Sequence, residues 1–294
     1  LFNLLTGLNR LKVLQRRLKN TSNPGIDGTI QQRLEALRSK IKQNEKLQVI
    51  VDKITGEMNR FEVIERLCAA AGAQTYLEIG VRNGDCFTAA DVPRKIGVDP
   101  VLPAEKVQKE LTKEGASYYQ MRSDEFFDMH ARLFSEHKID VAFIDGLHTY
   151  EQSLRDALNC LKYLSDEGVV IMHDCNPCST AAAVKAPDEE TAIQKAGDHG
   201  LVFDGQWMGD VWKTIVDLRS RRKDLFVCTL RCDCGIALIT RGIPESPLSY
   251  TSGKIKLLTY DDLEQHRNLF LNIKEQEYLF TFIQSRLKEK SMLS

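Results

Sequence analysis

The sequence has almost no net charge and no long apolar run, and both absences narrow the class of protein. Its 294 residues carry 40 Lys and Arg against 41 Asp and Glu, a formal net charge of −1. Without a basic excess, we expect no nucleic-acid partner. No apolar run approaches the roughly 18 residues that cross a bilayer, and no signal-peptide pattern is present. We therefore expect a cytoplasmic protein without a transmembrane segment.

The composition is that of a globular chain with an uneven charge distribution. Hydrophobic residues make up 43% and charged residues 28% of the sequence, which is typical of a folded domain. Residues 1–60 hold 12 Lys and Arg against 5 Asp and Glu. Within them, residues 1–20 place leucines at helical spacing between basic residues, a pattern that predicts a basic amphipathic helix. Such a helix packs on the body or on a second subunit, or binds a membrane surface or an acidic partner.

Three regions follow from these patterns. We expect an N-terminal helical extension over residues 1–56, a catalytic domain over 57–240 and a C-terminal helical extension over 241–294. The last region contains a capping-box pattern, Thr259-x-x-Asp262, that predicts a helix start. We expect the extensions to make the protein a homo-oligomer.

Residues 139–176 predict a strand, a helix and a second strand. An apolar run at 139–144 ends in Asp145, Gly146, Leu147 and His148, and a second run at 169–172 ends in His173 and Asp174. The segment between them has helical periodicity, with one stripe formed by Leu154, Leu158, Leu161 and Leu164. In a right-handed βαβ unit the strands are parallel, so both polar ends lie on the same edge of the sheet. Ligands of open α/β sheets bind at that edge.

Glycines and acids follow the earlier predicted strands. The strand at 75–79 runs into Glu78-x-Gly80-x-x-x-Gly84, and glycines there let the backbone approach a ligand. The strand at 95–98 ends at Asp99, which is placed to accept hydrogen bonds from ribose hydroxyls. A nicotinamide dehydrogenase would need glycine where this chain has Arg82 and Asp85. The pattern therefore favours a single nucleoside over a dinucleotide.

The remaining strands complete the predicted fold. A third strand at 118–121 precedes Ser123 and Asp124, and strands at 226–230 and 235–240 form a closing antiparallel pair. Together they predict an α/β fold, a Rossmann-like seven-stranded sheet with a terminal antiparallel hairpin and helical extensions at both ends. The irregular segment 177–208 is the expected lid over the substrate.

Two groups of motifs resemble a known family. The Glu78-Ile79-Gly80 turn with Gly84, Asp99 and the terminal hairpin resemble class I S-adenosylmethionine-dependent methyltransferases. The segment FIDGLHTY (143–150) with His173-Asp174 is similar to a branch that includes metal-dependent O-methyltransferases of sugar hydroxyls in macrolides and related natural products. The segment GDVWK (209–213) is similar to uncharacterised members found near surface-glycan genes. The resemblance covers roughly residues 57–240.

The resemblance implies S-adenosylmethionine as the cofactor and a set of residues that bind it. These are Glu78, Gly80, Asn83, Gly84, Asp99, Ser123, Asp124 and Asp145. It also implies that Asp145, Asp174 and the residue at 173 bind a divalent cation, Mg²⁺ or Mn²⁺, with Asp145 and His148 as the catalytic residues. The expected acceptor is a hydroxyl of a sugar, a glycan or another small natural product.

The physical chemistry agrees with these roles. A hard cation lowers the pKa of a bound hydroxyl, and a histidine with a pKa near neutrality accepts the proton. The related enzymes carry an acid where this chain has His173. A histidine ligand suits manganese, iron or zinc better than magnesium.

Several alternatives remain open at this point. Asp145 and Asp174 can be solvated acids, His148 a structural residue of its loop, and His173 a structural residue or a cofactor contact. The chain is then an O- or N-methyltransferase that works without metal, or an inert domain of the same fold. A zinc site, disulfides or reduced thiols are three readings of one group of cysteines: Cys175, Cys178, Cys232 and Cys234.

Overall fold

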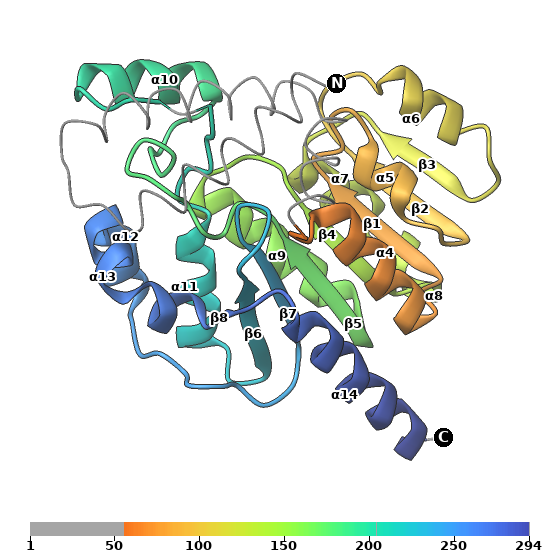
Figure 1. Cartoon of the computed structure of the whole chain (residues 1–294). Helices are drawn as coiled ribbons and strands as arrows, with labels where there is room; N and C mark the ends of the chain where they lie inside the picture. Colours follow the sequence, from red (N-terminus) through yellow and green to blue (C-terminus); the bar gives the residue numbers. More distant parts are fainter. Residues whose placement is uncertain (1–55, 204, 294) are drawn as a thin grey trace. The chain divides into compact units, whose positions relative to one another are not determined.

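A computed structural model describes residues 56–203 and 205–293 (Figure 1), with the side chains of 287–293 excepted. The expected N-terminal extension and its basic helix lie outside the described residues, apart from Gly56. Residues 56–203 and 207–293 belong to one compact unit. In the described part of the chain, no helix is long and apolar enough to span a membrane.

The described strands form one eight-stranded sheet in the order β3-β2-β1-β4-β5-β7-β6-β8. The pairs β1–β2, β1–β4, β2–β3 and β4–β5 are parallel, whereas β7 is antiparallel to β5 and β6. The strands are β1 (Thr75–Ile79), β2 (Arg94–Val98), β3 (Ala116–Tyr119), β4 (Ile139–Ile144), β5 (Leu164–Met172), β6 (Leu225–Leu230), β7 (Ile236–Arg241) and β8 (Ile273–Lys274). The predicted Rossmann-like sheet with its terminal antiparallel hairpin is confirmed.

The sheet has one strand more than the sequence predicted. β8 pairs in parallel with the outer edge of β6, through Thr229–Ile273 and Leu230–Lys274. Two residues give no strand periodicity, so this element has no signal in the sequence. It covers part of an edge that would otherwise expose unpaired N–H and C=O groups.

Helices cover both faces of the sheet. They are α4 (Arg60–Ala71), α5 (Asp85–Ala89), α6 (Glu105–Glu110), α7 (Ser123–His130), α8 (Leu133–Glu136), α9 (Tyr150–Tyr163), α10 (Glu189–Asp198), α11 (Trp212–Arg221), α12 (Ser252–Leu257), α13 (Tyr260–Leu271) and α14 (Tyr278–Leu293). Within β4, Ala142 and Ile144 pack with α7, α9 and α11, whereas Val141 and Phe143 pack with α4, α5 and α14. This alternation follows from the two-residue period of a strand that is buried on both faces.

The leucine stripe of α9 is not its buried side throughout, and Leu164 already belongs to β5. Leu158 of α9 is 40% exposed, while the buried side of this helix includes Tyr150, Ser153 and Asp156. The polar groups of this side are paired with neighbouring elements: the Tyr150 hydroxyl donates to Asp217 at 2.6 Å, and Ser153 bonds Thr214 at 2.7 Å. Buried polar groups are tolerated here because they form hydrogen bonds with α11. The positions of the leucines alone therefore do not identify the buried face.

The C-terminal residues pack on the sheet domain. α12 and α13 lie beside α11, and α14 lies against α4 (Figure 1). The predicted capping box of Thr259 and Asp262 opens α13. The Gln276 side chain accepts from the Met58 backbone N–H at 2.7 Å and donates to the Gly56 carbonyl at 2.8 Å. Gln276 therefore ties the segment before α4 to the segment before α14.

Candidate active site

The parallel strands bring the predicted site residues to one edge of the sheet. The ladder continues past the strand ends, because the Asp145 N–H donates to the Ile79 carbonyl at 2.9 Å and the His173 N–H to the Ile144 carbonyl at 3.0 Å. Gly80 has a φ of +84°, and a Cβ there would lie 2.1 Å from the Asp145 carbonyl oxygen. Only glycine allows this close approach of the β1 turn to the end of β4.

Two carboxylates and two imidazoles meet at the ends of β4 and β5. His173 Nδ1 lies 3.4 Å from Asp145 Oδ1 and 3.3 Å from Asp174 Oδ1. On the other side, His148 Nε2 lies 3.4 Å from Asp145 Oδ1 and 3.3 Å from Asp174 Oδ2. The side chains of His148 and Asp145 are 16% and 20% exposed, whereas those of His173 and Asp174 are buried. The cluster is thus open on the side of His148.

The segment before α11 holds His148 in place. His148 Nδ1 lies 2.8 Å from the Trp207 carbonyl oxygen, and a carbonyl only accepts, so this nitrogen donates and Nε2 faces the carboxylates. The rings of His148 and Trp207 lie 5.0 Å apart. Gly209 has a φ of +56°, and a Cβ there would lie 1.8 Å from the His148 carbonyl oxygen. The glycine of the GDVWK segment is therefore required by its contact with the loop that carries His148.

The charges of the cluster balance one another. Burial lowers the pKa of His148, but the Asp174 and Asp145 carboxylates outweigh it and raise that pKa to about 9. Burial also lowers the pKa of His173, but the Asp174 and Asp145 carboxylates outweigh it and raise that pKa well above its usual value. Burial raises the pKa of Asp145, yet the two histidines hold it well below its usual range. Protons on the imidazoles thus neutralise the carboxylates when no other cation is present.

These residues fit a divalent cation. Ligand atoms of Asp145, His173 and Asp174 lie within 4.8 Å of one another. His173 Nδ1 is buried and has no hydrogen-bond partner in the described part of the chain. A cavity of about 10 Å³ is lined by Asp145, His148 and His173, among others. Two carboxylates with an imidazole form a donor set suited to Mn²⁺ or a similar ion.

The cofactor candidates lie along the same edge. Glu78 is buried and accepts from the Tyr76 hydroxyl at 2.6 Å; burial raises its pKa well above the usual value, although that hydrogen bond opposes the shift. Asp99 accepts from the backbone N–H groups of Arg82 and Val101, both at 2.9 Å. Each oxygen of Asp99 keeps a second lone pair for a ribose hydroxyl.

The second glycine of the motif after β1, Gly84, is also required by the structure. Gly84 has a φ of +79°, and a Cβ there would lie 2.2 Å from Val107 Cγ2 of α6. Asn83, beside it, is exposed. The turn is thus shaped by packing against α6, with Asn83 on its outer side.

A polar network that the sequence did not indicate surrounds Ser123. The Ser123 hydroxyl donates to Asp156 Oδ1 at 2.6 Å, and the Gln152 amide donates to Ser123, Asp124 and Asp156 at 3.0 to 3.2 Å. Burial raises the pKa of Asp156 to about 6, although the hydrogen bonds from Ser123 and Gln152 oppose it. α9 therefore supports the residues predicted to lie near the base of the cofactor.

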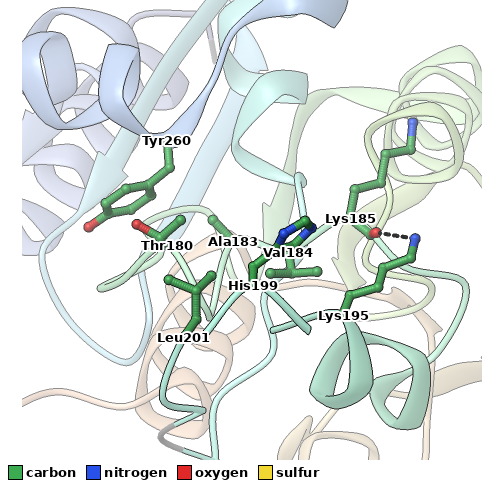
Figure 2. Close-up of a pocket in the computed structure, with 8 residues that line it drawn as sticks. All are labelled: Thr180, Ala183, Val184, Lys185, Lys195, His199, Leu201 and Tyr260. Atoms are coloured by element: carbon green, nitrogen blue, oxygen red, sulfur yellow. Dashed lines mark hydrogen bonds between the residues drawn. The ribbon is translucent and has the colours of Figure 1, made fainter. Parts of the chain in front are cut away.

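A cavity of about 620 Å³ lies between the chain after β5 and the start of α13 (Figure 2). Its lining residues are Thr180, Ala183, Val184, Lys185, Lys195, His199, Leu201 and Tyr260. Figure 2 shows the two lysines on one side and Tyr260 on the other. The Trp207 indole N–H donates to the Val184 carbonyl at 2.8 Å, so Trp207 links this wall to His148. The predicted lid segment contributes most of the lining and contains α10.

The cysteine segments meet, but their thiols do not gather into a four-thiolate group. The Cys175 N–H donates to the Gly235 carbonyl at 3.0 Å, and the Asn176 N–H to the Cys234 carbonyl at 2.9 Å. All eight cysteines lie in the described part, and none is in a disulfide. Of the candidate metal groups among the described residues, only one contains a cysteine, Cys234 with His173 and Asp233.

The arrangement of Asp233 and Arg60 beside His173 was missed by the sequence analysis. Asp233 belongs to the RCDC turn between β6 and β7, which drew notice only for its thiols. Its Oδ1 lies 3.3 Å from His173 Nε2, and Arg60 pairs with it at 3.1 Å. The only available signal was indirect, since a hairpin whose second strand pairs with β5 must begin near the end of β5.

Comparisons with known proteins give one family match and several distant structural similarities. Residues 77–175 match the family model described as a methyltransferase domain. No curated protein sequence matches the chain. The solved structures that resemble it include the S-adenosylhomocysteine-bound methyltransferase PaMTH1 of Podospora anserina, with 15% identity, 62% of this chain and 78% of that chain covered, and a TM-score of 0.44.

Two further structures show the same level of similarity. A candidate caffeoyl-CoA O-methyltransferase of Staphylococcus aureus has 14% identity, with 80% of this chain and 100% of that chain covered and a TM-score of 0.46. The O-methyltransferase TomG of Streptomyces achromogenes has 12% identity, with 62% and 79% covered and a TM-score of 0.43. These similarities are low. Residues 77–175 thus match a methyltransferase domain, and they contribute most of β1 and all of β2 to β5 of the Rossmann-like sheet.

Proposed function

We propose that this protein transfers the methyl group of S-adenosylmethionine to a hydroxyl of a small molecule, with His148 as the general base. The acceptor class is a sugar, a glycan or a related natural product. The observation that carries this proposal is the meeting of His148 with Asp145 and Asp174 at 3.3 to 3.4 Å. This cluster lies at the sheet edge where the turn after β1 and the end of β2 also lie.

The cofactor is assigned to the residues along that edge. Asp99 holds the ribose hydroxyls, Asp124 and Ser123 lie near the base, and the backbone around Gly80 and Gly84 forms the floor. Glu78, Asn83 and Asp145 complete the set. Because the transferred methyl group leaves a positively charged sulfonium, the chemical step depends mainly on alignment and on exclusion of water.

His148 is oriented for proton transfer. The Trp207 carbonyl holds Nδ1–H, so Nε2 is the nitrogen that takes the proton of the acceptor hydroxyl. A raised pKa of about 9 would keep this imidazole protonated at neutral pH. The carboxylates that raise it are those assigned to the cation, so we expect His148 to be a free base only when their charge is neutralised.

Asp145, Asp174 and His173 are assigned to a divalent cation. When bound, the cation supplies positive charge that lowers the pKa of a coordinated hydroxyl. Nδ1 of His173 is buried and makes no hydrogen bond with the described residues. This feature and the nearness of the three ligand atoms support the assignment.

The 620 Å³ cavity is assigned to the acceptor. Its wall joins the apolar surface of Ala183, Val184 and Leu201 to polar groups of Lys195 and His199. A wall of this kind suits a hydroxylated small molecule, in which apolar faces and hydrogen-bonding groups alternate. Trp207 contacts both this wall and His148, so we expect its ring to lie beside the reacting hydroxyl.

Calorimetric titration with S-adenosylhomocysteine tests the first part of the proposal. The protein is treated with a chelator and titrated with and without Mn²⁺ or Mg²⁺. We expect saturable binding of the cofactor product, and a separate metal-binding heat that is lost in Asp174→Ala. The absence of S-adenosylhomocysteine binding would reject the enzymatic assignment in favour of an inert domain.

A methyl-transfer screen tests the second part. Labelled S-adenosylmethionine is incubated with a panel of sugars, phenols and amines, with chelator or with Mn²⁺. Metal-dependent labelling of hydroxyl compounds supports the proposal. Full activity in the presence of chelator would instead identify a metal-independent O- or N-methyltransferase.

A further inference from the structure

A carboxylate and a guanidinium stand on the far side of His173 from the proposed cation site. Asp233 Oδ1 lies 3.3 Å from His173 Nε2, and its side chain is 14% exposed. Arg60 NH1 lies 3.1 Å from the same imidazole nitrogen. His173 thus faces Asp145 and Asp174 with one nitrogen and an ion pair with the other.

Arg60 anchors the Asp233 side chain from two directions. Its backbone N–H, in the first turn of α4, donates to Asp233 Oδ2 at 2.8 Å. Its guanidinium donates to both carboxylate oxygens at 3.1 and 3.2 Å. Asp233 itself has a φ of +37°, a backbone region that non-glycine residues adopt rarely. These contacts hold the Asp233 carboxylate beside His173.

Arg60 also argues against a second metal at this place. Ligand atoms of His173, Asp233 and Cys234 lie within 4.8 Å of one another, which is a candidate group by itself. The Arg60 guanidinium already contacts His173 and Asp233, and it is a permanent cation. The Asp233 carboxylate is therefore already engaged by His173 and Arg60.

The two neighbours of Nε2 favour opposite tautomers of a neutral imidazole. Arg60 only donates, so its contact requires a lone pair on Nε2 and a proton on Nδ1. Asp233 accepts, so its contact requires a proton on Nε2 and a lone pair on Nδ1. Only the second tautomer lets Nδ1 bind a metal. Without Asp233, Arg60 would remain as the neighbour of Nε2 and would favour the tautomer that blocks binding.

We propose that Asp233 is a positioning residue that holds His173 in the tautomer with a free Nδ1 lone pair, and so sets the affinity of the Asp145–His173–Asp174 group for a divalent cation. This inference rests on the cation of the proposed function. A carboxylate behind a metal-binding histidine raises the basicity of the ligand and fixes its ring.

Metal affinity of the intact protein tests the proposal without any methyl acceptor. Free Mn²⁺ is measured by electron paramagnetic resonance as chelator-treated protein is titrated. Asp233→Ala should weaken Mn²⁺ binding by about 10- to 100-fold, the usual effect of losing such a partner. Asp233→Asn keeps an oxygen that accepts from Nε2–H, and should recover part of the loss. The affinity for S-adenosylhomocysteine, measured on each variant, should stay unchanged and thereby shows that the fold is kept.

A double-mutant cycle separates positioning from simple loss of negative charge. If Asp233 acts through His173, Asp233→Ala should have little further effect in a His173→Ala background. An equal loss in both backgrounds would overturn the proposal, because charge alone would then explain it. Nitrogen NMR of the Zn²⁺-loaded protein should show His173 protonated at Nε2, and a proton at Nδ1 would overturn it as well.

The Mn²⁺ titration also separates the proposed cation site from the proposed role of Asp233. If the wild-type protein binds no Mn²⁺, the cation of the proposed function is wrong and the role of Asp233 falls with it. If the wild type binds Mn²⁺ and Asp233→Ala binds it equally well, only the positioning role is wrong.

Discussion

Replacing Gly209 by alanine tests whether the segment before α11 positions His148. Gly209 has a φ of +56°, and its added Cβ would lie 1.8 Å from the His148 carbonyl oxygen. Gly72, at the C-terminal end of α4, has a φ of +59° and nothing within 4 Å of an added Cβ. The two substitutions therefore share a backbone cost and differ in the steric one, which makes Gly72→Ala the matched control.

The difference between the variants can be worked out from these contacts. Each alanine in the left-handed region costs about 1–2 kcal/mol. At position 209 the Cβ and the carbonyl oxygen must also move apart by about 1.5 Å to reach ordinary contact, and overpacking of this kind costs typically 1–3 kcal/mol. We therefore expect Gly209→Ala to lose about 2–5 kcal/mol of unfolding free energy, and Gly72→Ala about 1–2 kcal/mol.

Urea unfolding followed by tryptophan fluorescence measures both losses. Turnover should fall about 100-fold in Gly209→Ala, since a displacement near 1 Å of a catalytic group has that effect. It should stay near the wild-type value in Gly72→Ala, and both variants should bind S-adenosylhomocysteine. If Gly209→Ala is no less stable and no less active than Gly72→Ala, the contact with His148 does not position the base.

Three other substitutions test separate parts of the site. Asp99→Ala should weaken S-adenosylhomocysteine binding by about 1–3 kcal/mol through lost charged hydrogen bonds, and an unchanged affinity in calorimetry would remove the ribose assignment. His148→Ala should lower turnover by roughly 10²–10⁴ while cofactor affinity is kept; activity retained in the labelled methyl-transfer assay at neutral pH would place the base elsewhere. The folded-state pKa of Asp156 is about 6, above the 3.8 of a free carboxyl, so the folded state holds this proton more tightly. The stabilisation of the folded state by protonated Asp156 is full below pH 3.8, and about 3 kcal/mol of it is lost as the pH rises through about 6. Asp156→Asn should therefore gain stability relative to the wild type between about pH 5 and pH 7.5 in urea unfolding; the same pH dependence in both proteins would contradict the burial of this charge.

The meeting of two carboxylates and two imidazoles was predictable because these residues lie within one βαβ unit. Asp145, His148, His173 and Asp174 each follow a strand end or lie within a few residues of one, and parallel strands place such ends at one edge. The glycines at 80 and 84 were predictable for a related reason, since a turn that packs closely against another backbone admits no side chain.

The supporting contacts were not predictable in the same way. Asp233 and Arg60 come from a hairpin and a helix start that have no local link to His173. Asp156 lies on α9, whose buried side is partly polar. The spacing of the leucines therefore did not identify the buried side of this helix. In each case the partner that makes a buried polar group acceptable comes from a distant part of the chain.

The contact of Gln276 with Met58 has a consequence for how far the chain can be shortened. A protein ending after Arg241 would keep seven of the strands, from β1 to β7. It would lose the side chain that accepts from the Met58 amide, only two positions before Arg60. Asn59 would still cap α4, but the segment just before Arg60 would lose its anchor to the C-terminal region. Truncation would also uncover the two core clusters, because Phe270 and Leu279 are buried in them. Residues 242–294 therefore belong to the folding unit of the sheet and are not a removable appendage.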